Sequence, residues 1–167
     1  RARVHSALAR DGHAGAFDEQ TPEVIGRSAA GDFTGLFAIC QAFLPTMVEQ
    51  GRGSIINISS RTAFGPQSKN GPYGAAKAAV NSLTETLSVE LAPRIRVNAV
   101  APGPIPTQNF IECTKVDPTQ LEAMEKTLPI PLRRFGTPED IGAAVVFMAS
   151  PAASWVTGQC LYVTGGM

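Results

Sequence analysis

Apolar residues recur at three- and four-residue spacing in three segments, the pattern of helices that bury one face. The first predicted helix runs from Thr21 to Gln50, with Thr21 as N-cap and a proline at the first helical position. The second runs from Tyr73 to Ala92 and stops at a proline. The third begins at Thr137, which precedes Asp140 by the three-residue spacing of a capping box. Glycines and a proline within the first helix predict a bend near its ends.

Short runs that are apolar on both faces alternate with these helices and predict buried strands. They are Ser54–Ser60, Ile95–Ala101 and Cys160–Val163, with a weaker candidate at Arg3–Leu8. A short amphipathic helix is expected at Asp117–Lys126. Alternation of strand and helix predicts an α/β fold with a parallel sheet. It also predicts that residues 1–167 form a single α/β domain.

Composition narrows the function classes. The chain is 44% hydrophobic and 17% charged, so it can bury a core, and its 14 basic residues balance 14 acidic ones. This balance argues against a nucleic-acid partner held by phosphate neutralisation.

The longest uninterrupted apolar stretch, Ile141–Ala149, is too short to span a membrane. Three distant cysteines and two histidines suggest neither disulfides nor a metal site, and free, buried thiols favour a cytoplasmic protein. Trp155 is expected to be a packing anchor.

Tyr73 and Lys77 are the first candidates for chemistry. Their spacing of four places the phenol and the ammonium on the same face of a helix, one turn apart. A cation near a phenol favours the phenolate, so we expect Lys77 to lower the pKa of Tyr73 toward neutrality. The alternative is an exposed tyrosine beside a solvated lysine.

Two further candidates follow predicted strands, where ligands collect in parallel sheets. Ser60 ends the strand Ser54–Ser60 and could hydrogen-bond a substrate oxygen, or it could simply cap its own turn. The segment Pro102–Thr107 contains a glycine that permits close backbone approach to a flat ligand and prolines that stiffen it. The alternative for this segment is a rigid turn.

Together these motifs strongly resemble the short-chain dehydrogenase/reductase family. NISS, a serine-to-tyrosine spacing of thirteen, YGAAK, IRVNAVAPGPIPT and VTGQCLYVTGG occur in the family's order, over about residues 32–167. The C-terminal half looks closest to bacterial hydroxysteroid dehydrogenases and 3-oxoacyl-carrier-protein reductases. The resemblance implies the C-terminal part of a Rossmann-like, doubly wound parallel sheet.

The resemblance also implies roles for single residues in an oxidoreductase that interconverts a secondary alcohol and a ketone, with NAD or NADP as cofactor. Tyr73 would be the acid or base at the substrate oxygen, Ser60 would orient that oxygen, and Lys77 would hold the nicotinamide ribose. The nicotinamide would be held by Pro102, Gly103, Ile105 and Thr107. Residues 109–126 would cover the substrate, with Phe110 and Ile111 facing the pocket.

One departure from the family lies in the first long helix. Family members place an asparagine there, three residues before a glycine, as part of a proton relay to the lysine. This chain has Asp32 at that position. An ionised Asp32 beside Lys77 would partly cancel the field that lowers the pKa of Tyr73, or it could act as a relay carboxylate. We expect slowed rather than abolished chemistry.

The second departure is larger, because the sequence contains no TGxxxGxG loop, the segment that cradles the cofactor pyrophosphate in the family. The family's NNAG segment would fall near residues 5–8, where HSAL matches it poorly. We therefore expect the first strands of the fold to be absent and turnover by this chain alone to be weak. The alternative function is a truncated relative that cannot bind cofactor and acts as an interaction or regulatory subunit. The family's usual assembly implies a homo-oligomer, a dimer or tetramer, through the two long helices and the last strand.

Overall fold

The computed structural model describes residues 15–65 and 67–167, and its sheet has three parallel strands. The strands are β1 (Gly53–Ile58), β2 (Ile95–Pro102) and β3 (Cys160–Val163), in the order β1-β2-β3. Gly53 pairs with Ile95 at one end of the first ladder, and Ala99 pairs with Cys160 in the second. The three strands therefore lie where their apolar runs predicted, although β1 ends two residues early. The weak candidate at residues 3–8 lies outside the described residues.

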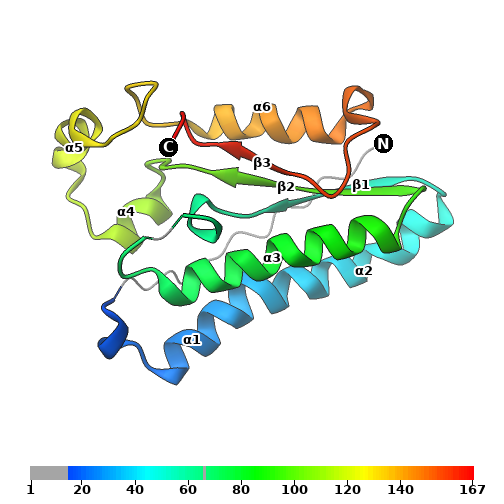
Figure 1. The fold of residues 1–167 in the computed structure, drawn as a ribbon, viewed down its shortest axis with the longest axis horizontal. Coiled ribbons are helices and arrows are strands. Elements are labelled where there is room, and N and C mark those ends of the chain that lie inside the picture. Colours follow the sequence, from blue (N-terminus) through cyan, green and yellow to red (C-terminus); the bar gives the residue numbers. More distant parts are fainter. Residues whose placement is uncertain (1–14, 66) are drawn as a thin grey trace.

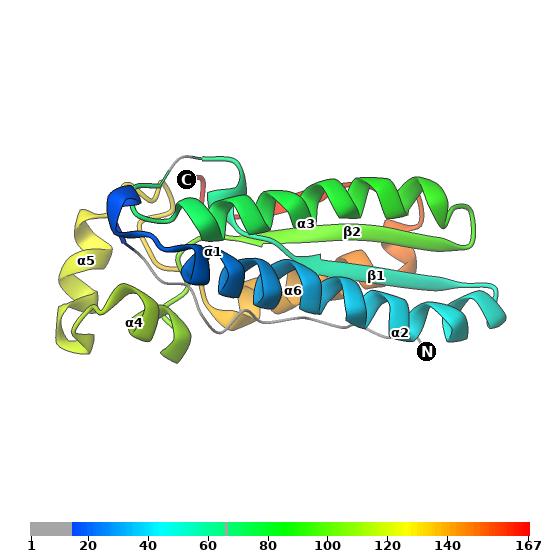
Figure 2. The same ribbon diagram turned by 90° about the horizontal axis from the view of Figure 1, so that it is seen from below.

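Helices cover both faces of this sheet (Figure 1). The helices α1 (Pro22–Ala29), α2 (Gly35–Glu49) and α3 (Gly71–Glu90) lie on one face, and α6 (Pro138–Ala149) lies on the other. The shorter helices α4 (Gln108–Thr114) and α5 (Leu121–Thr127) stand beyond the carboxyl ends of the strands. In the view from below, α2 and α3 run side by side along the sheet (Figure 2).

Each face of the sheet has its own apolar core. On the α2–α3 face, Ile55, Ile95 and Val97 pack with Met47, and on the α6 face Ile56 and Val100 pack with Met148. Because side chains alternate between the two faces of a strand, the neighbours Ile55 and Ile56 pack into the cores on opposite faces of the sheet. This two-sided burial is why the strands are nearly continuous apolar runs. Among the described strands β2 is central and β1 lies at the edge, whereas the sequence predicted an interior position for β1.

The predicted helix Thr21–Gln50 is interrupted in its middle rather than bent near its ends. A π-helical turn, η2 (Ala30–Thr34), joins α1 to α2 and contains Asp32. Thr21 is the N-cap residue as predicted, but its side chain makes no capping hydrogen bond to the backbone. Thr137 and Asp140, in contrast, form the predicted capping box of α6.

The expected helix Asp117–Lys126 is present as a 3-10 turn, Pro118–Gln120, that continues into α5. The segment after β2 also contains the helix α4, which the sequence pattern did not predict. Two expectations about side-chain burial were wrong. Trp155 is 99% exposed and therefore anchors no packing within the described part of the chain. The three cysteines are free, as expected, but half-buried rather than buried.

Within the described residues, the continuous helical run Pro22–Glu49 is long and apolar enough to cross a membrane by length and composition. Charged and polar residues divide this helical run, so no uninterrupted apolar stretch indicated it from the sequence. Helices that cover the sheet of a soluble protein can pass the same test. Here the run packs against β1 and α3 and carries the buried Asp32, so its contacts in the fold account for part of its apolar character.

Candidate active site

Tyr73 and Lys77 lie in the first turns of α3, near the carboxyl end of β1. Lys77 is 3% exposed, and its Nζ donates a hydrogen bond to the backbone oxygen of Ile58 at 3.1 Å. The same Nζ lies 5.7 Å from the centroid of the Tyr73 ring. The spacing of four therefore puts the two side chains together, as predicted, and the lysine is buried rather than solvated.

Asp32 faces Lys77 from the π-helical turn η2. Its Oδ1 lies 3.1 Å from Lys77 Nζ, and the two side chains are only 2% and 4% exposed. A buried charge is costly unless a partner of opposite charge lies beside it, so each residue stabilises the charged form of the other. The predicted proximity of Asp32 to Lys77 is confirmed.

The pKa of Tyr73 is raised to about 12, whereas we expected Lys77 to lower it. Burial of the phenol is the largest cause, and the nearby Asp32 and Cys113 also raise this pKa. A hydrogen bond with Ser60 acts in the opposite direction. The expectation was wrong because it left out the burial of the ring, while Asp32, 3.1 Å from the ammonium, acts in the direction that the sequence had indicated.

Ser60 follows β1 and begins the 3-10 turn η3 (Arg61–Ala63). Its Oγ accepts hydrogen bonds from Thr62 N at 3.2 Å and Thr62 Oγ1 at 2.9 Å, so it caps its own turn. The same hydroxyl interacts with the Tyr73 phenol. The cap alternative for Ser60 is therefore confirmed, and the same hydroxyl reaches Tyr73; its hydrogen bond to a substrate oxygen stays a prediction.

The segment Pro102–Thr107 leaves the carboxyl end of β2 beside the end of β3. Gly103 N donates to Val163 O at 2.9 Å, and a Cβ on Gly103 would lie 2.8 Å from Thr164 Cα. Only glycine allows this close approach of two backbones. Thr107 caps α4 by accepting a hydrogen bond from Phe110 N. Phe110 packs edge-on against Phe135, with ring centroids 6.1 Å apart.

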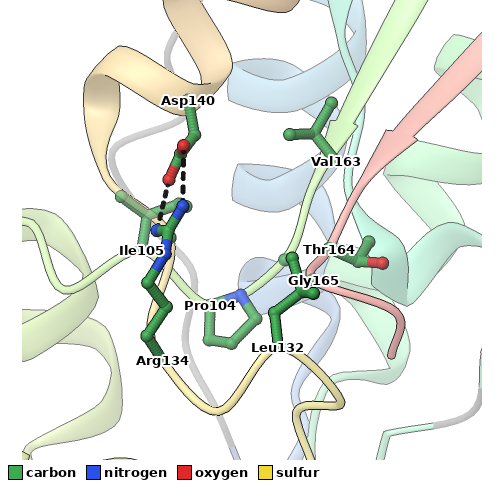
Figure 3. Close-up of a pocket in the computed structure, with 10 residues that line it drawn as sticks. Pro104, Ile105, Leu132, Arg134, Asp140, Val163, Thr164 and Gly165 are labelled. Carbon is green, nitrogen blue, oxygen red and sulfur yellow. Dashed lines mark hydrogen bonds and ion pairs between the residues drawn. The ribbon is translucent and has the colours of Figure 1, made fainter.

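A pocket of about 150 Å³ opens beside this segment (Figure 3). Arg134 and Asp140 stand at one side of it and form two hydrogen bonds, at 2.6 and 3.0 Å. The lining residues include none of Ser60, Tyr73 and Lys77; they are Gly103, Pro104, Ile105, Leu132, Arg134, Gly136, Asp140, Val163, Thr164 and Gly165. The pocket therefore adjoins the loop after β2 rather than the tyrosine. The part of the chain that the structure describes contains no cluster of metal-ligating side chains.

Residues 3–167 match the family model described as enoyl-(acyl carrier protein) reductase. The human dehydrogenase/reductase SDR family member 4 is 44% identical over 127 residues, which are 75% of this chain and 45% of that protein. A 3-oxoacyl-[acyl-carrier-protein] reductase of Thermotoga maritima is 42% identical over 135 residues, 80% of this chain and 52% of that protein.

The chain belongs to the short-chain dehydrogenase/reductase family. Its fold matches a gluconate 5-dehydrogenase from Burkholderia cenocepacia, solved with NADP and tartrate, at a TM-score of 0.87 and 29% identity. That match covers 98% of this chain and 63% of the solved one. The chain spans about half the length of the curated relatives that it matches.

Sequence reasoning missed two features of this short-chain dehydrogenase/reductase site. Cys113, on α4, lies near enough to Tyr73 to influence its pKa, and α4 itself was not predicted. The π-helical turn around Asp32 was also missed, although Gly31 within that turn and Gly35 directly after it were a usable signal. The predicted site residues Ser60, Tyr73, Lys77 and Asp32 do come together.

Proposed function

We propose that this chain is the catalytic part of an NAD(P)-dependent oxidoreductase that interconverts a secondary alcohol and a ketone. The observation that carries the proposal is the meeting of Ser60, Tyr73 and Lys77 near the carboxyl end of β1. A hydroxyl, a phenol and an ammonium in one half-buried place can bind an oxygen and exchange a proton with it. Relatives named as a 3-oxoacyl reductase and a gluconate 5-dehydrogenase support alcohol–carbonyl chemistry.

The residues present fit the nicotinamide end of such a cofactor. An ammonium has three N–H donors; Lys77 Nζ donates one of them to Ile58 O and lies 3.1 Å from Asp32 Oδ1, so a third donor is left for a ligand. A sugar hydroxyl suits that third donor and the adjacent Tyr73 phenol. Gly103 lines the pocket beside this segment, where a flat ring could approach. No Gly-rich pyrophosphate loop follows a strand among the described residues, so these side chains account for only half of the cofactor's contacts.

The nicotinamide cofactor, when bound, supplies or accepts the hydride. Ser60, held by the η3 turn, would hydrogen-bond the substrate oxygen and fix its position. Tyr73 would donate its phenolic proton to a carbonyl oxygen during reduction, or accept one from an alcohol. Lys77 would hold the ribose hydroxyls, and the segment Pro102, Gly103, Ile105 and Thr107 would hold the ring. Residues 109–126, with Phe110 and Ile111, would cover the substrate.

Replacing Tyr73 by phenylalanine tests this proposal. We expect Tyr73→Phe to lower kcat by about 10²- to 10⁴-fold for a simple ketone with reduced cofactor, because the variant lacks the transferable proton. Tyr162→Phe is the matched control, since Tyr162 is a half-exposed phenol on β3, and it should retain activity. Equal activities of the two variants would contradict the role of Tyr73. No turnover by the parent protein would instead favour the interaction or regulatory subunit.

The proposed partner is a further copy of the chain. Large apolar side chains remain exposed on both long helices: Val89 on α3 is 78% exposed, and Val48 on α2 is 46% exposed. Large apolar side chains that a fold leaves exposed are often covered in an interface. We place one face of a homo-oligomer on α2 and α3, and a second at the last strand, where Tyr162 is exposed.

A further inference from the structure

The buried pair of Asp32 and Lys77 affects how readily Tyr73 releases its proton. The two side chains are 3.1 Å apart and almost fully buried, in surroundings where solvent screens charges weakly. A carboxylate at that distance partly cancels the electric field of the ammonium at any group that lies near both charges. Tyr73 is such a group, because its ring lies 5.7 Å from Lys77 Nζ and its pKa responds to Asp32.

The charged and titratable groups that face Tyr73 come from three elements. Lys77 lies one turn along α3, Asp32 faces it from η2, and Cys113 faces it from α4, while the neutral hydroxyl of Ser60 hydrogen-bonds the phenol. Asp32 and Cys113 both oppose the formation of a phenolate, and burial of the ring opposes it most. Apart from the offset ammonium of Lys77, the hydrogen bond with Ser60 is the contact that favours the phenolate.

We propose that Asp32 offsets the charge of Lys77 at the Tyr73 phenol and so, together with the burial of the ring, favours the protonated phenol, which suits the site to carbonyl reduction more than to alcohol oxidation. This inference rests on the proposed function and adds its direction. In that direction the carbonyl carbon gains a hydride from the reduced cofactor, and the carbonyl oxygen gains the Tyr73 proton. The carbonyl is reduced to an alcohol, the cofactor is oxidised, and the phenolate takes up one proton from solvent. Alcohol oxidation needs the phenolate at the start and is therefore confined to alkaline pH.

A phenolate titration without cofactor or substrate tests the proposal. The ultraviolet absorbance of the parent protein is followed as pH rises, and the signal that disappears in Tyr73→Phe is assigned to Tyr73. We expect Asp32→Asn to move this titration down by about one pH unit or more, because the ammonium is no longer offset. The side chain of asparagine has nearly the same shape, and far-ultraviolet circular dichroism checks that the variant folds.

Glu23→Gln is the matched control, because it also removes one carboxylate from the same helical run but at an exposed position. It should leave the Tyr73 titration in place. A Tyr73 titration that is unchanged or raised in folded Asp32→Asn overturns the proposal. Because this measurement needs no turnover, its outcome is independent of whether the protein proves to be an oxidoreductase.

The pH profile of alcohol oxidation gives the second measurement. With Tyr73 required as a base, the rising limb of the profile should move to lower pH in Asp32→Asn by the same amount as the phenolate titration. The alkaline limb of ketone reduction should move down with it. Coinciding profiles of parent and variant, in both directions, would remove Asp32 from any effect on the reaction.

Discussion

At the residue scale, the distinctive feature of this protein is an aspartate, Asp32, paired with Lys77 beside Tyr73. Asp32 and Lys77 are 2% and 4% exposed, so the charge of each depends on the other for its compensation. The sequence predicted that they would meet, since both positions matched a family pattern. It did not predict the pKa of Tyr73, because burial of the ring is a property of the assembled fold.

Stability measurements on variants of this pair provide a prediction at the same scale. We expect Lys77→Met to destabilise the protein by about 3–5 kcal/mol, because Asp32 is left buried with an uncompensated charge. The double variant Asp32→Asn with Lys77→Met should recover most of that loss, since no charge then remains buried. Urea unfolding of the parent, the two single variants and the double variant measures the coupling. Purely additive effects would mean that the two charges do not stabilise each other.

At the element scale, short interruptions of regular structure position the candidate site. The π-helical turn η2 directs Asp32 toward α3, the η3 turn orients the Ser60 hydroxyl, and the segment after β2 passes close to the end of β3. Helices and strands were largely predictable, because each has one or two apolar faces of regular period. The π-helical turn and α4 were not, because they carry no apolar period of their own and are held by contacts with other elements.

The close approach at Gly103 leads to a prediction about this segment. Gly103→Ala would place a Cβ 2.8 Å from the backbone of Thr164, so one strand end must move. We expect a loss of about 1–3 kcal/mol in the free energy of unfolding, as for other overpacked sites. Gly142→Ala in α6 is the control, because its Cβ meets no atom within 4 Å. It should instead stabilise the helix by about 0.5–1 kcal/mol. Equal effects of the two substitutions in urea unfolding would contradict the packing argument.

At the scale of the whole molecule, the described chain leaves apolar surface uncovered. It spans about half the length of its curated relatives, and large apolar side chains on α2 and α3 are exposed. Trp155, which the sequence suggested as a packing anchor, is 99% exposed. These surfaces are available to further copies of the chain, as we propose, and to other parts of the family fold.

If the chain forms a homo-oligomer through α3, a charge introduced on that helix should lower the mass of the assembly. Val89→Lys replaces an exposed apolar side chain of α3 by an ammonium. Removing that ammonium from water in an interface would cost free energy. We expect this variant to dissociate into smaller species, measured by light scattering after size-exclusion chromatography. Ala123→Lys, at an exposed position on α5, should keep the parent's mass. A parent that is monomeric, or a Val89→Lys variant of unchanged mass, would remove α3 from the interface.

The amino-acid sequence by itself determined which segments became strands and most of the helices, because apolar periodicity is a local property. It also determined which residue types meet in the candidate site, since Ser60, Tyr73 and Lys77 stand at spacings that the parallel sheet brings together. Only the tertiary structure decided the electrostatic surroundings of those residues. Packing of η2 against α3 places Asp32 beside Lys77, and burial of the phenol raises the pKa of Tyr73 to about 12. Electrostatic effects depend on distance and solvent exposure, which become defined only when the elements pack.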